Sequence, residues 1–595
     1  MNNSNISNKL DSSKTHSTPL PREGGVGGES GSYILMESLK AQGVNTIFGY
    51  PGGSIMPVYD ALFDYTQGEK KAFDHILVRH EQGAIHAAQG YARVSGNVGT
   101  VIVTSGPGVA NTLTGIADAM IDSTPVVVIA GQVGVGVLGT DAFQELDLIT
   151  VAQPICKWVY QIRRPEDIPW AVSKAYYLAK SGRPGPVVLD FPKNAQVSKC
   201  EYVPETVNFV RSYIPSPRPK QEKIEAAAEL INNAKKPLAL VGQGVELAGA
   251  HEELKAFLEK ANIPAGRTML GLSALASNHP LNMGMLGMHG NYAPNIKQQE
   301  ADVVIAIGMR FSDRVTGNLA TYLKQAKVIH LDIDHAEINK NVQVDVAIVA
   351  DCKESLPMLT ELVNKADHKE WIESFKPLCE KEQEKVVKKA LYPTEGPLLM
   401  GEVANAVAEA TKGMGVTVTD VGQNQLFSTR YSKYNTPRSI ITSGGLGTMG
   451  FGLPAAIGAT FGEKERPVFA FMGDGGLQMT IQELGTIMEY HCPVKIVLMN
   501  NNFLGNVRQW QNMFFRKRYA FTHMLNPNYE EICAAYKIPY LKVKDRKDLP
   551  AAIDKALNTA GPFFLETIIM EEDDVMPMTA PGASVNDMML EKEAN

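Results

Sequence analysis

Cysteine is scarce in this sequence: 6 occur in 595 residues, at positions 156, 200, 352, 379, 492 and 533. No two of them have the spacing of a C-x-x-C pair. So few cysteines, spread so widely, exclude a disulfide framework and a multi-cysteine zinc site. They indicate reduced, buried thiols in a cytoplasmic protein.

Long hydrophobic runs and a strong charge of one sign are also missing. No stretch has the roughly 20 apolar residues that a membrane helix needs, and residues 1–30 lack the apolar core of a secretory signal. Residues 1–30 are rich in Asn, Ser and Gly, and we expect a disordered tail there. A net charge of -7 and a pI near 6.0 give no reason to expect nucleic acid or an anionic membrane as a partner.

What is present is the composition of a globular protein, with 44% apolar and 20% charged residues. Short β-branched runs alternate with helix-like stretches, which predicts buried parallel strands with helices between them. These runs lie at residues 100–104, 125–130, 186–191, 238–241, 303–307, 328–333, 416–421, 468–472, 494–499 and 563–569. We therefore expect an α/β fold of doubly wound parallel sheets.

Two stretches interrupt this pattern. Residues 202–220 are rich in proline, and residues 367–397 are charged, so both are interpreted as linkers. Within the second, residues 382–389 are expected to form a solvated helix face. At roughly 100–200 residues per domain, the length predicts three or four domains. We place them at residues 31–200, 215–365 and 395–570, with a C-terminal tail at 571–595.

A glycine turn around Asp474 ends one predicted strand, and Asn501 follows the next, 27 positions later. That is about the length of one right-handed crossover, which places both residues at the carboxyl ends of neighbouring strands. A carboxylate, an amide oxygen and the backbone carbonyl of Phe503 suit Mg²⁺, with a diphosphate completing the shell. Taken alone, Gly-Asp-Gly favours a plain turn; the asparagines at crossover spacing favour the metal site.

Glu81 lies near the start of a second helical pattern, after a short strand-like run. The simplest interpretation is a carboxylate favoured by the helix dipole. His80 and His86 do not have the spacing of a zinc-binding H-E-x-x-H motif, so we interpret both as structural.

Gly473-Asp474-Gly475, followed by Asn500-Asn501, resembles the signature of thiamine-diphosphate enzymes. The resemblance implies that Asp474, Asn501 and the Phe503 carbonyl hold Mg²⁺. It also implies that Glu81 hydrogen-bonds the pyrimidine ring of thiamine and activates the cofactor by acid–base catalysis. In this family the two halves of one site come from different chains, which implies a homodimer or homotetramer.

Several loops resemble the acetolactate synthase family in particular, although each alone could be a tight turn. In the first domain, Phe143 and Gln144 would face the reacting carbon, and Asn111 would lie near the cofactor. Met449 would wedge thiamine into its bent shape; without the resemblance it would be taken as core. The cofactor contacts implied in these loops are Tyr50, Pro51, Gly53, Pro107, Asn111, Val421, Gly422, Gln423, Asn424, Gly447, Met449, Gly473, Gly475 and Gly476.

The middle domain has a weak G-x-G, a strand ending in acidic residues, and two arginines, which together favour a dinucleotide. By resemblance this is the FAD domain of the biosynthetic acetolactate synthases, in which the flavin is structural. The implied contacts are Arg183, Gly242, Gly244, Leu286, Gly287, Met288, His289, Gly308, Arg310, Arg314, Val315, Asp332, Ile333 and Asp351.

The resemblance also implies the substrates, pyruvate and 2-oxobutanoate, and the products, 2-acetolactate and 2-aceto-2-hydroxybutanoate, on the route to valine, leucine and isoleucine. Trp510 would shape the acceptor pocket, Arg310 would hold the acceptor carboxylate, and Lys193 would lie near the channel mouth. The tail would close over the site, and a separate small regulatory subunit is usual in the family. Three residues depart from the usual pattern, namely Asn424, Asn506 and Ser312.

Three other functions compete with this one. A flavin-using relative such as pyruvate oxidase is disfavoured by Trp510 and the segment 310–314. A dinucleotide-binding regulator without catalysis is disfavoured by the intact set of Glu81, Asp474 and Asn501. An NAD-dependent dehydrogenase would need a full G-x-G-x-x-G after the first strand of a domain, and the sequence has none in that setting.

Overall fold

The computed structural model describes residues 28–592. The predicted disordered tail therefore lies almost wholly outside the described residues. Its last two residues form β1 (Glu29–Ser30), which pairs antiparallel with β8 (Lys199–Cys200). No helix in the described part of the chain is long and apolar enough to cross a membrane.

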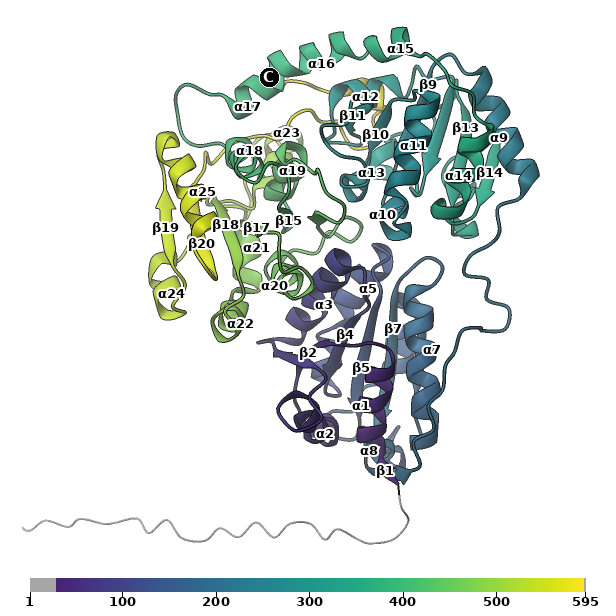
Figure 1. The fold of residues 1–595 in the computed structure, drawn as a ribbon. Helices are drawn as coiled ribbons and strands as arrows, with labels where there is room; N and C mark the ends of the chain where they lie inside the picture. The colour runs from purple at the N-terminus through teal and green to yellow at the C-terminus, as the bar shows by residue number, and fades with distance from the viewer. Residues whose placement is uncertain (1–27, 593–595) are drawn as a thin grey trace, which may run out of the picture.

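Three six-stranded sheets follow one another along the chain (Figure 1). All strand pairs within them are parallel, which confirms the predicted fold class. In spatial order, the N-terminal sheet consists of β3 (Asp74–Leu77), β2 (Thr46–Tyr50), β4 (Gly99–Val103), β5 (Val126–Gln132), β7 (Pro186–Pro192) and β6 (Trp158–Gln161). The middle sheet consists of β11 (Asn282–Met285), β10 (Ala265–Arg267), β9 (Pro237–Val241), β12 (Val303–Ile307), β13 (Lys327–Asp332) and β14 (Val346–Val349). The C-terminal sheet consists of β16 (Ile440–Ile441), β15 (Val416–Thr419), β17 (Val468–Gly473), β18 (Val494–Asn500), β20 (Phe563–Ile568) and β19 (Tyr540–Val543).

The strand order distinguishes the middle sheet from the other two. Numbered within its own domain, the middle sheet runs 3-2-1-4-5-6, which is the order of dinucleotide-binding folds. The N-terminal and C-terminal sheets both run 2-1-3-4-6-5, so these two domains share one topology. In open parallel sheets, ligands bind at the carboxyl ends of the strands where the order reverses. Each domain therefore presents one crevice of this kind.

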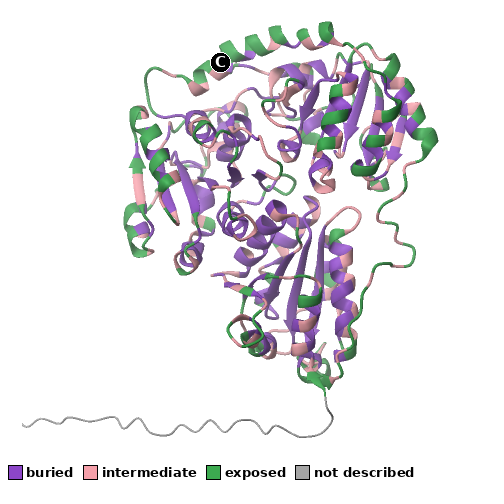
Figure 2. Cartoon of the chain, in the orientation of Figure 1, coloured by how far each residue is buried: buried purple, intermediate pink, exposed green. Residues whose placement is uncertain are grey.

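Helices cover both faces of each sheet, and the central strands are buried between them, whereas edge strands such as β19 and β6 are partly exposed (Figure 2). Successive residues of β9 and β12 enter two separate core clusters, because side chains alternate across a sheet. The longer helices of the N-terminal domain are α1 (Gly31–Ala41), α2 (Met56–Thr66), α3 (Glu81–Ser95), α5 (Leu113–Ile121) and α7 (Ile168–Lys180). Those of the middle domain are α9 (Gln221–Asn233), α11 (His251–Ala261) and α14 (Cys352–Leu362). Those of the C-terminal domain are α18 (Met400–Ala410), α19 (Gln423–Tyr431), α20 (Gly452–Gly462), α23 (Gly505–Phe514) and α25 (Leu549–Asn558), with the shorter α21 (Asp474–Met479) and α24 (Tyr529–Ala535).

The second predicted linker is largely helical. Helices α15 (Lys369–Glu373), α16 (Lys376–Glu382) and α17 (Lys388–Leu391) run along the top of the molecule from the middle to the C-terminal domain (Figure 1). The prediction of a solvated face at residues 382–389 is wrong for Glu382, which is 4% exposed and pairs with the buried Arg430. Glu382 also accepts hydrogen bonds from Asn291 and from the backbone N–H of Tyr292. A charge pattern along the chain does not reveal a distant partner of this kind.

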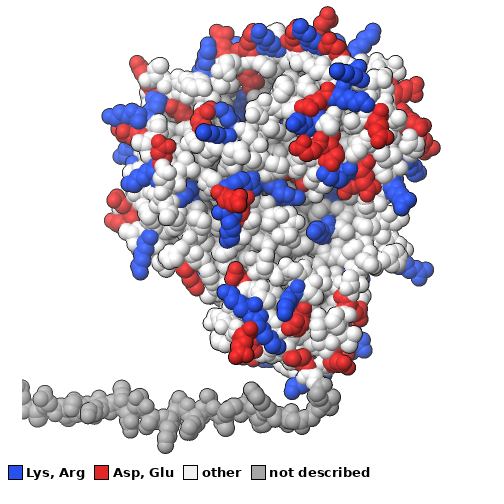
Figure 3. Space-filling view, viewed as in Figure 1, with Lys and Arg blue, Asp and Glu red and all other residues white. Residues whose placement is uncertain are grey.

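Acidic and basic side chains are interspersed over the face of the molecule seen in Figure 3. On this face no surface of one sign dominates. A mixed surface agrees with the small net charge of -7.

Candidate active site

The two predicted metal ligands lie side by side in the C-terminal domain. Gly473 of β17 pairs in register with Met499 of β18, so Asp474 and Asn501 emerge from adjacent strand ends. Both side chains are buried, at 1% and 2% exposure. The crevice between β15 and β17, where the strand order reverses, opens beside Asp474.

Asp474 is a buried carboxylate without a basic partner. Among residues 28–592, no Lys, Arg or His forms an ion pair with it. Burial raises the pKa of Asp474, because desolvation disfavours its charged form. The described chain gathers no three His, Cys, Asp or Glu side chains into a metal cluster. One carboxylate among amide and carbonyl oxygens suits a hard cation that shares its shell with a phosphate.

Two of the loops predicted to contact the cofactor are joined by Asp420, which the sequence analysis did not single out. Its carboxylate accepts hydrogen bonds from the backbone N–H groups of Val421 at 2.8 Å, Gly450 at 3.1 Å and Gly452 at 2.9 Å. A Cβ at Gly476 would lie 2.2 Å from the same carboxylate. Burial raises the pKa of Asp420 to about 6. Asp420 therefore connects the end of β15 to the loop that contains Gly447 and Met449.

Other predicted contacts in these loops have clear positions. The amide of Asn424 donates to the Phe471 carbonyl, and its oxygen lies 3.3 Å from where a Cβ at Gly473 would be. The Met449 methyl group lies 3.6 Å from the Cβ position of Gly475. Gln423, by contrast, donates its amide to Gln509 and to the Asp573 carbonyl. Its side-chain N–H groups are therefore engaged with α23 and with the C-terminal tail.

Glu81 begins helix α3, and its neighbours form a second group of predicted residues. Asn111 donates a hydrogen bond to Glu81 Oε2 at 2.9 Å, and Glu81 Oε1 lies 3.4 Å from the Cβ position of Gly108. Gln144 lies beside the loop that contains Gly106 and Gly108, since its backbone carbonyl oxygen is 2.8 Å from the Cβ position of Gly106. The group lies at the crevice between β2 and β4.

Four further residues named in the sequence analysis lie at the surface of this domain or have structural roles. Phe143 is 88% exposed, and Lys193 is exposed at the start of α8 (Lys193–Val197). His80 caps α3 by accepting from the backbone N–H of Gln82. His86 is fully buried, and burial lowers its pKa to about 3. In the described chain, no hydrogen bond joins the Glu81 group to the Asp474 group.

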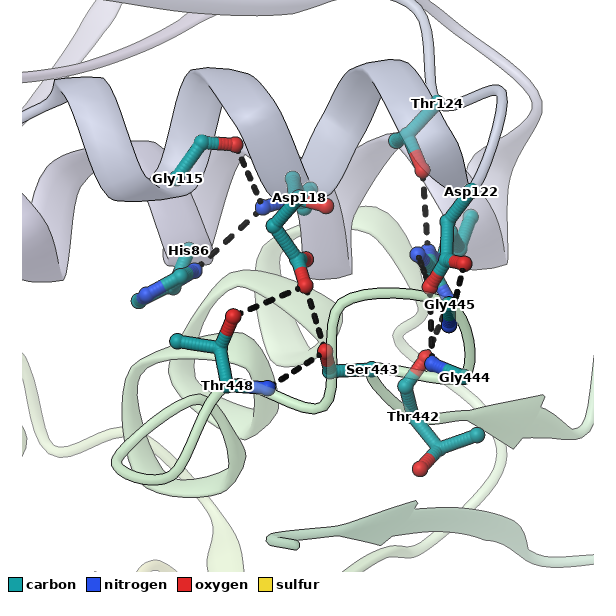
Figure 4. Close-up of polar contacts among 12 residues, drawn as sticks. His86, Gly115, Asp118, Asp122, Thr124, Thr442, Ser443, Gly444, Gly445 and Thr448 are labelled. Atoms are coloured by element: carbon teal, nitrogen blue, oxygen red, sulfur yellow. Dashed lines mark hydrogen bonds and ion pairs between the residues drawn. The ribbon is translucent and has the colours of Figure 1, made fainter.

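Two buried aspartates at α5 (Figure 4) are among the contacts between the N-terminal and C-terminal domains, which also include the packing of α3 on α20. Asp122 accepts hydrogen bonds from the backbone of Gly444 at 2.8 Å and Gly445 at 2.7 Å. Asp118 accepts from the hydroxyls of Ser443 and Thr448. These contacts position residues 443–448, a loop that the sequence analysis connected only with the cofactor.

A cavity of about 1020 Å³ lies between the middle domain and its neighbours. Most residues predicted to bind flavin line it, namely Arg183, Gly244, Leu286, Gly287, Met288, His289, Gly308, Arg310, Arg314, Val315, Asp332, Ile333 and Asp351. Gly242 does not line the cavity. A Cβ at Gly242 would lie 2.2 Å from the Gly308 carbonyl, so this glycine allows the turns after β9 and β12 to approach each other.

One charged group of this cavity, the Arg183 guanidinium, is fixed by contacts across domains. Arg183 of the N-terminal domain pairs with Asp334 at 3.1 Å and Glu337 at 2.7 Å in the middle domain. Asp332 at the end of β13 is buried, which raises its pKa to about 6. Burial lowers the pKa of His289 to about 4. A long ligand with both polar and apolar parts fits such a lining.

The predicted acceptor residues line the same cavity. Arg310, Trp510 and Asn506 all line it, together with Leu446 and Gly447 of the cofactor loop. The C-terminal tail approaches from outside, where the Thr579 N–H donates to the Met288 carbonyl at 2.9 Å. Val585 of the tail packs into the core of the middle domain.

Three family descriptions match this chain. They are "Thiamine pyrophosphate enzyme, N-terminal TPP binding domain" over residues 29–151, "central domain" over 224–359 and "C-terminal TPP binding domain" over 420–567. The matched segments contain the Glu81 group, most of the cavity lining and the Asp474 group in turn. The fold and the site therefore define a thiamine pyrophosphate enzyme.

Curated relatives narrow this class. The acetolactate synthase large subunit of Lactococcus lactis is 42% identical over 562 residues, covering 94% of this chain and 96% of the relative. The isozyme 2 large subunit of Escherichia coli is 42% identical over 567 residues, with 95% and 100% covered. The large subunit from Corynebacterium glutamicum is 41% identical over 576 residues, with 94% and 90% covered. The chain belongs to the acetolactate synthase large subunits.

Proposed function

We propose that the protein decarboxylates pyruvate and joins the remaining two-carbon unit to a second 2-oxo acid. With pyruvate as acceptor the product is 2-acetolactate, and with 2-oxobutanoate it is 2-aceto-2-hydroxybutanoate, both precursors of branched-chain amino acids. The observation that carries this proposal is the buried Asp474, without a basic partner, beside Asn501 at adjacent strand ends. Full-length similarity to acetolactate synthases supports the substrate assignment.

Thiamine diphosphate fits the C-terminal crevice through its phosphates and Mg²⁺. Asp474, Asn501 and the Phe503 carbonyl would hold the cation, and the glycines at 473, 475 and 476 would admit the diphosphate. The Asn501 amide nitrogen is buried without a hydrogen-bond partner, and the amide oxygen accepts one bond, from the Phe503 N–H at 3.3 Å, which leaves it a lone pair for a cation. When bound, thiamine stores the electrons released by decarboxylation.

Glu81 would hold and move the proton that activates the cofactor ring. Asn111 donates to Oε2 of Glu81 and fixes the plane of the carboxyl group. Oε1 is left to face the small Gly108, where the absence of a side chain admits a ring. General acid–base catalysis requires a carboxyl group held in a fixed orientation, which Asn111 would give Glu81.

FAD fits the large cavity, where we assign it a structural role. The dinucleotide-binding strand order, the glycine turns after β9 and β12, and Asp332 at the end of β13 support a dinucleotide there. Arg183 and Arg314 would neutralise its phosphates, and Asp332 would accept from ribose hydroxyls. The cavity also reaches Trp510 and Arg310, which we assign to the acceptor.

A second copy of the chain would complete the site. Apolar side chains are exposed around both half-sites, and monomers rarely leave such patches open to water. On the N-terminal domain these are Tyr50, Met56, Val135, Val137 and Phe143, and on the C-terminal domain they are Leu446, Met479, Val507, Phe515, Phe521 and Leu525. A two-fold dimer would cover the exposed apolar side chains of both domains at once. We also expect a small regulatory subunit, because the relatives are named large subunits.

The proposal is tested by assaying acetolactate formed from pyruvate with thiamine diphosphate, Mg²⁺ and FAD omitted in turn. Omitting either of the first two should abolish product, and bound flavin should not bleach during turnover. Oxygen-dependent formation of acetyl phosphate instead of acetolactate would overturn the proposal in favour of an oxidase.

A further inference from the structure

Asn526 reaches the predicted metal ligands although it lies 52 residues after Asp474. The segment that carries it crosses the carboxyl ends of β17 and β18. Backbone hydrogen bonds hold this segment, from Leu504 to the Thr522 carbonyl and from Met524 to the Asn502 carbonyl, both at 2.8 Å. The Met524 sulfur lies 3.2 Å from the Cβ position of Gly475. The segment therefore forms one wall of the Asp474 crevice.

The side-chain nitrogen of Asn526 lies where three oxygens converge. Its two N–H groups are shared among three acceptors, Asp474 Oδ2 at 2.8 Å, Asn500 Oδ1 at 2.9 Å and Asn502 Oδ1 at 3.1 Å. These acceptors belong to the ends of both β17 and β18. One amide group thus holds the carboxylate ligand and the residues on either side of Asn501 in a single arrangement.

The orientation of the Asn526 amide follows from its other contacts. Its oxygen accepts from Gln478 Nε2 at 2.9 Å, which assigns oxygen to that side and nitrogen to the Asp474 side. Tyr529 adds a weaker contact to the same oxygen at 3.4 Å. Gln478 lies on α21, the helix that begins at Asp474. Hydrogen bonds therefore connect Gln478 of α21, through Asn526, to Asp474, which is the first residue of the same helix.

Asp474 has a second fixed oxygen, since Oδ1 accepts from the backbone N–H of Gly475 at 3.0 Å. Each carboxylate oxygen therefore has one donor and keeps lone-pair capacity for a further ligand. A neutral amide leaves the full negative charge for a cation, whereas a Lys or Arg at this place would compete with it. The use of Asn as the donor thus favours cation binding.

We infer that Asn526 is a positioning residue for the divalent cation, which it orients indirectly by fixing Asp474 and the strand ends around Asn501. The inference rests on the proposed metal site and deepens it. Partners of metal ligands typically contribute 10–100-fold to metal affinity, because they fix the ligand's orientation. Within the described residues, no other side chain contacts both Asp474 and the 500–502 turn by hydrogen bonds.

The test is a titration of the full-length protein with Mn²⁺ after a chelator has removed bound metal, with and without thiamine diphosphate. The concentration of free Mn²⁺ is measured at each step. Asn526→Ala and the similarly sized Asn526→Leu should both weaken Mn²⁺ binding about 10–100-fold. At saturating Mg²⁺, the kcat of these variants should recover towards that of the unchanged protein. The reason is that the substitution lowers the fraction of sites that hold a cation, and saturating Mg²⁺ fills them. A merely structural defect would not be rescued in this way.

Asn528→Ala is the matched control, because Asn528 lies in the same segment and only caps α24 through the Glu530 N–H. It should bind Mn²⁺ normally. Normal Mn²⁺ affinity in both Asn526 variants, or an equal loss in Asn528→Ala, overturns the inference. Asp474→Asn separates the two hypotheses. If this variant binds Mn²⁺ normally, the proposed metal site itself is wrong. If it loses Mn²⁺ affinity while both Asn526 variants bind normally, only the positioning role is refuted.

Discussion

The carboxylate of Asp122 accepts a hydrogen bond from the backbone N–H of Gly445 at 2.7 Å, across the boundary between the N-terminal and C-terminal domains. Asp122 also forms a buried ion pair with Arg93 at 2.9 Å. Arg93 lies on α3, the helix that begins at Glu81. One ion pair therefore connects the helix of the predicted catalytic acid to the loop that is predicted to receive the cofactor.

Asp122→Ala should destabilise the protein by about 3–5 kcal/mol, because it leaves the Arg93 charge buried without an acidic partner. The measurement is the free energy of unfolding from urea denaturation. The exposed pair of Arg164 and Asp167 provides the control, and Asp167→Ala should cost less than about 1 kcal/mol. Similar losses in the two variants would refute the structural role of Asp122.

Glu81→Gln should lower kcat by about 10²–10⁴-fold, because an amide cannot exchange the proton that a carboxyl group holds. Binding of thiamine diphosphate should change much less, since the phosphate contacts are elsewhere. Steady-state acetolactate formation and a cofactor titration measure the two effects. Glu489→Gln, at a partly exposed glutamate paired with Arg79, should retain activity. Near-normal turnover in Glu81→Gln would rule out its assigned role.

Mixing two inactive variants should restore activity if each site is shared between chains. In a heterodimer of Glu81→Gln and Asp474→Asn protomers, one site carries both substitutions and the other carries neither. Random re-association of equal amounts should then recover about a quarter of normal activity. If both halves of a site came from one chain, every site would be impaired. A mixture without recovered activity, but with heterodimers detected by mass, would contradict the shared site.

Asp332→Asn should stabilise the flavin-free protein at neutral pH. Burial raises the folded pKa of Asp332 from 3.8 to about 6, so keeping it charged above pH 6 costs stability. The expected gain is at most about 3 kcal/mol at pH 8, and it should shrink as the pH falls through 6 and vanish below about 4. Urea denaturation across this pH range measures it.

Asp345→Asn is the control with the opposite sign. The pKa of Asp345 is lowered, because its small burial penalty is outweighed by hydrogen bonds from Lys327 and the Val328 N–H. This variant should therefore lose stability at neutral pH and approach the unchanged protein in acid. A pH-independent effect at residue 332 would show that its ionisation is not the cause.

Several features of the site were predictable from local patterns. Asp474 and Asn501 end two buried runs one crossover apart, and parallel topology with right-handed connections leaves few ways to place them. Glu81 precedes a helical pattern, and α3 begins there as expected. The metal ligands themselves required the resemblance, because Gly-Asp-Gly alone also fits an ordinary turn.

The sequence by itself determined where the strands lie, that their sheets are parallel, and which residues stand at the strand ends. The reason is that hydrophobic periodicity and crossover length are properties of short segments. Tertiary structure decided the roles of Asp420, Asn526, Asp122 and Glu382, which depend on side chains that meet after distant segments fold together. It also decided the large cavity beside the middle domain, since three domains contribute to its lining. A hydrogen bond between distant loops leaves no periodic trace in the chain, and for this reason only the folded protein reveals it.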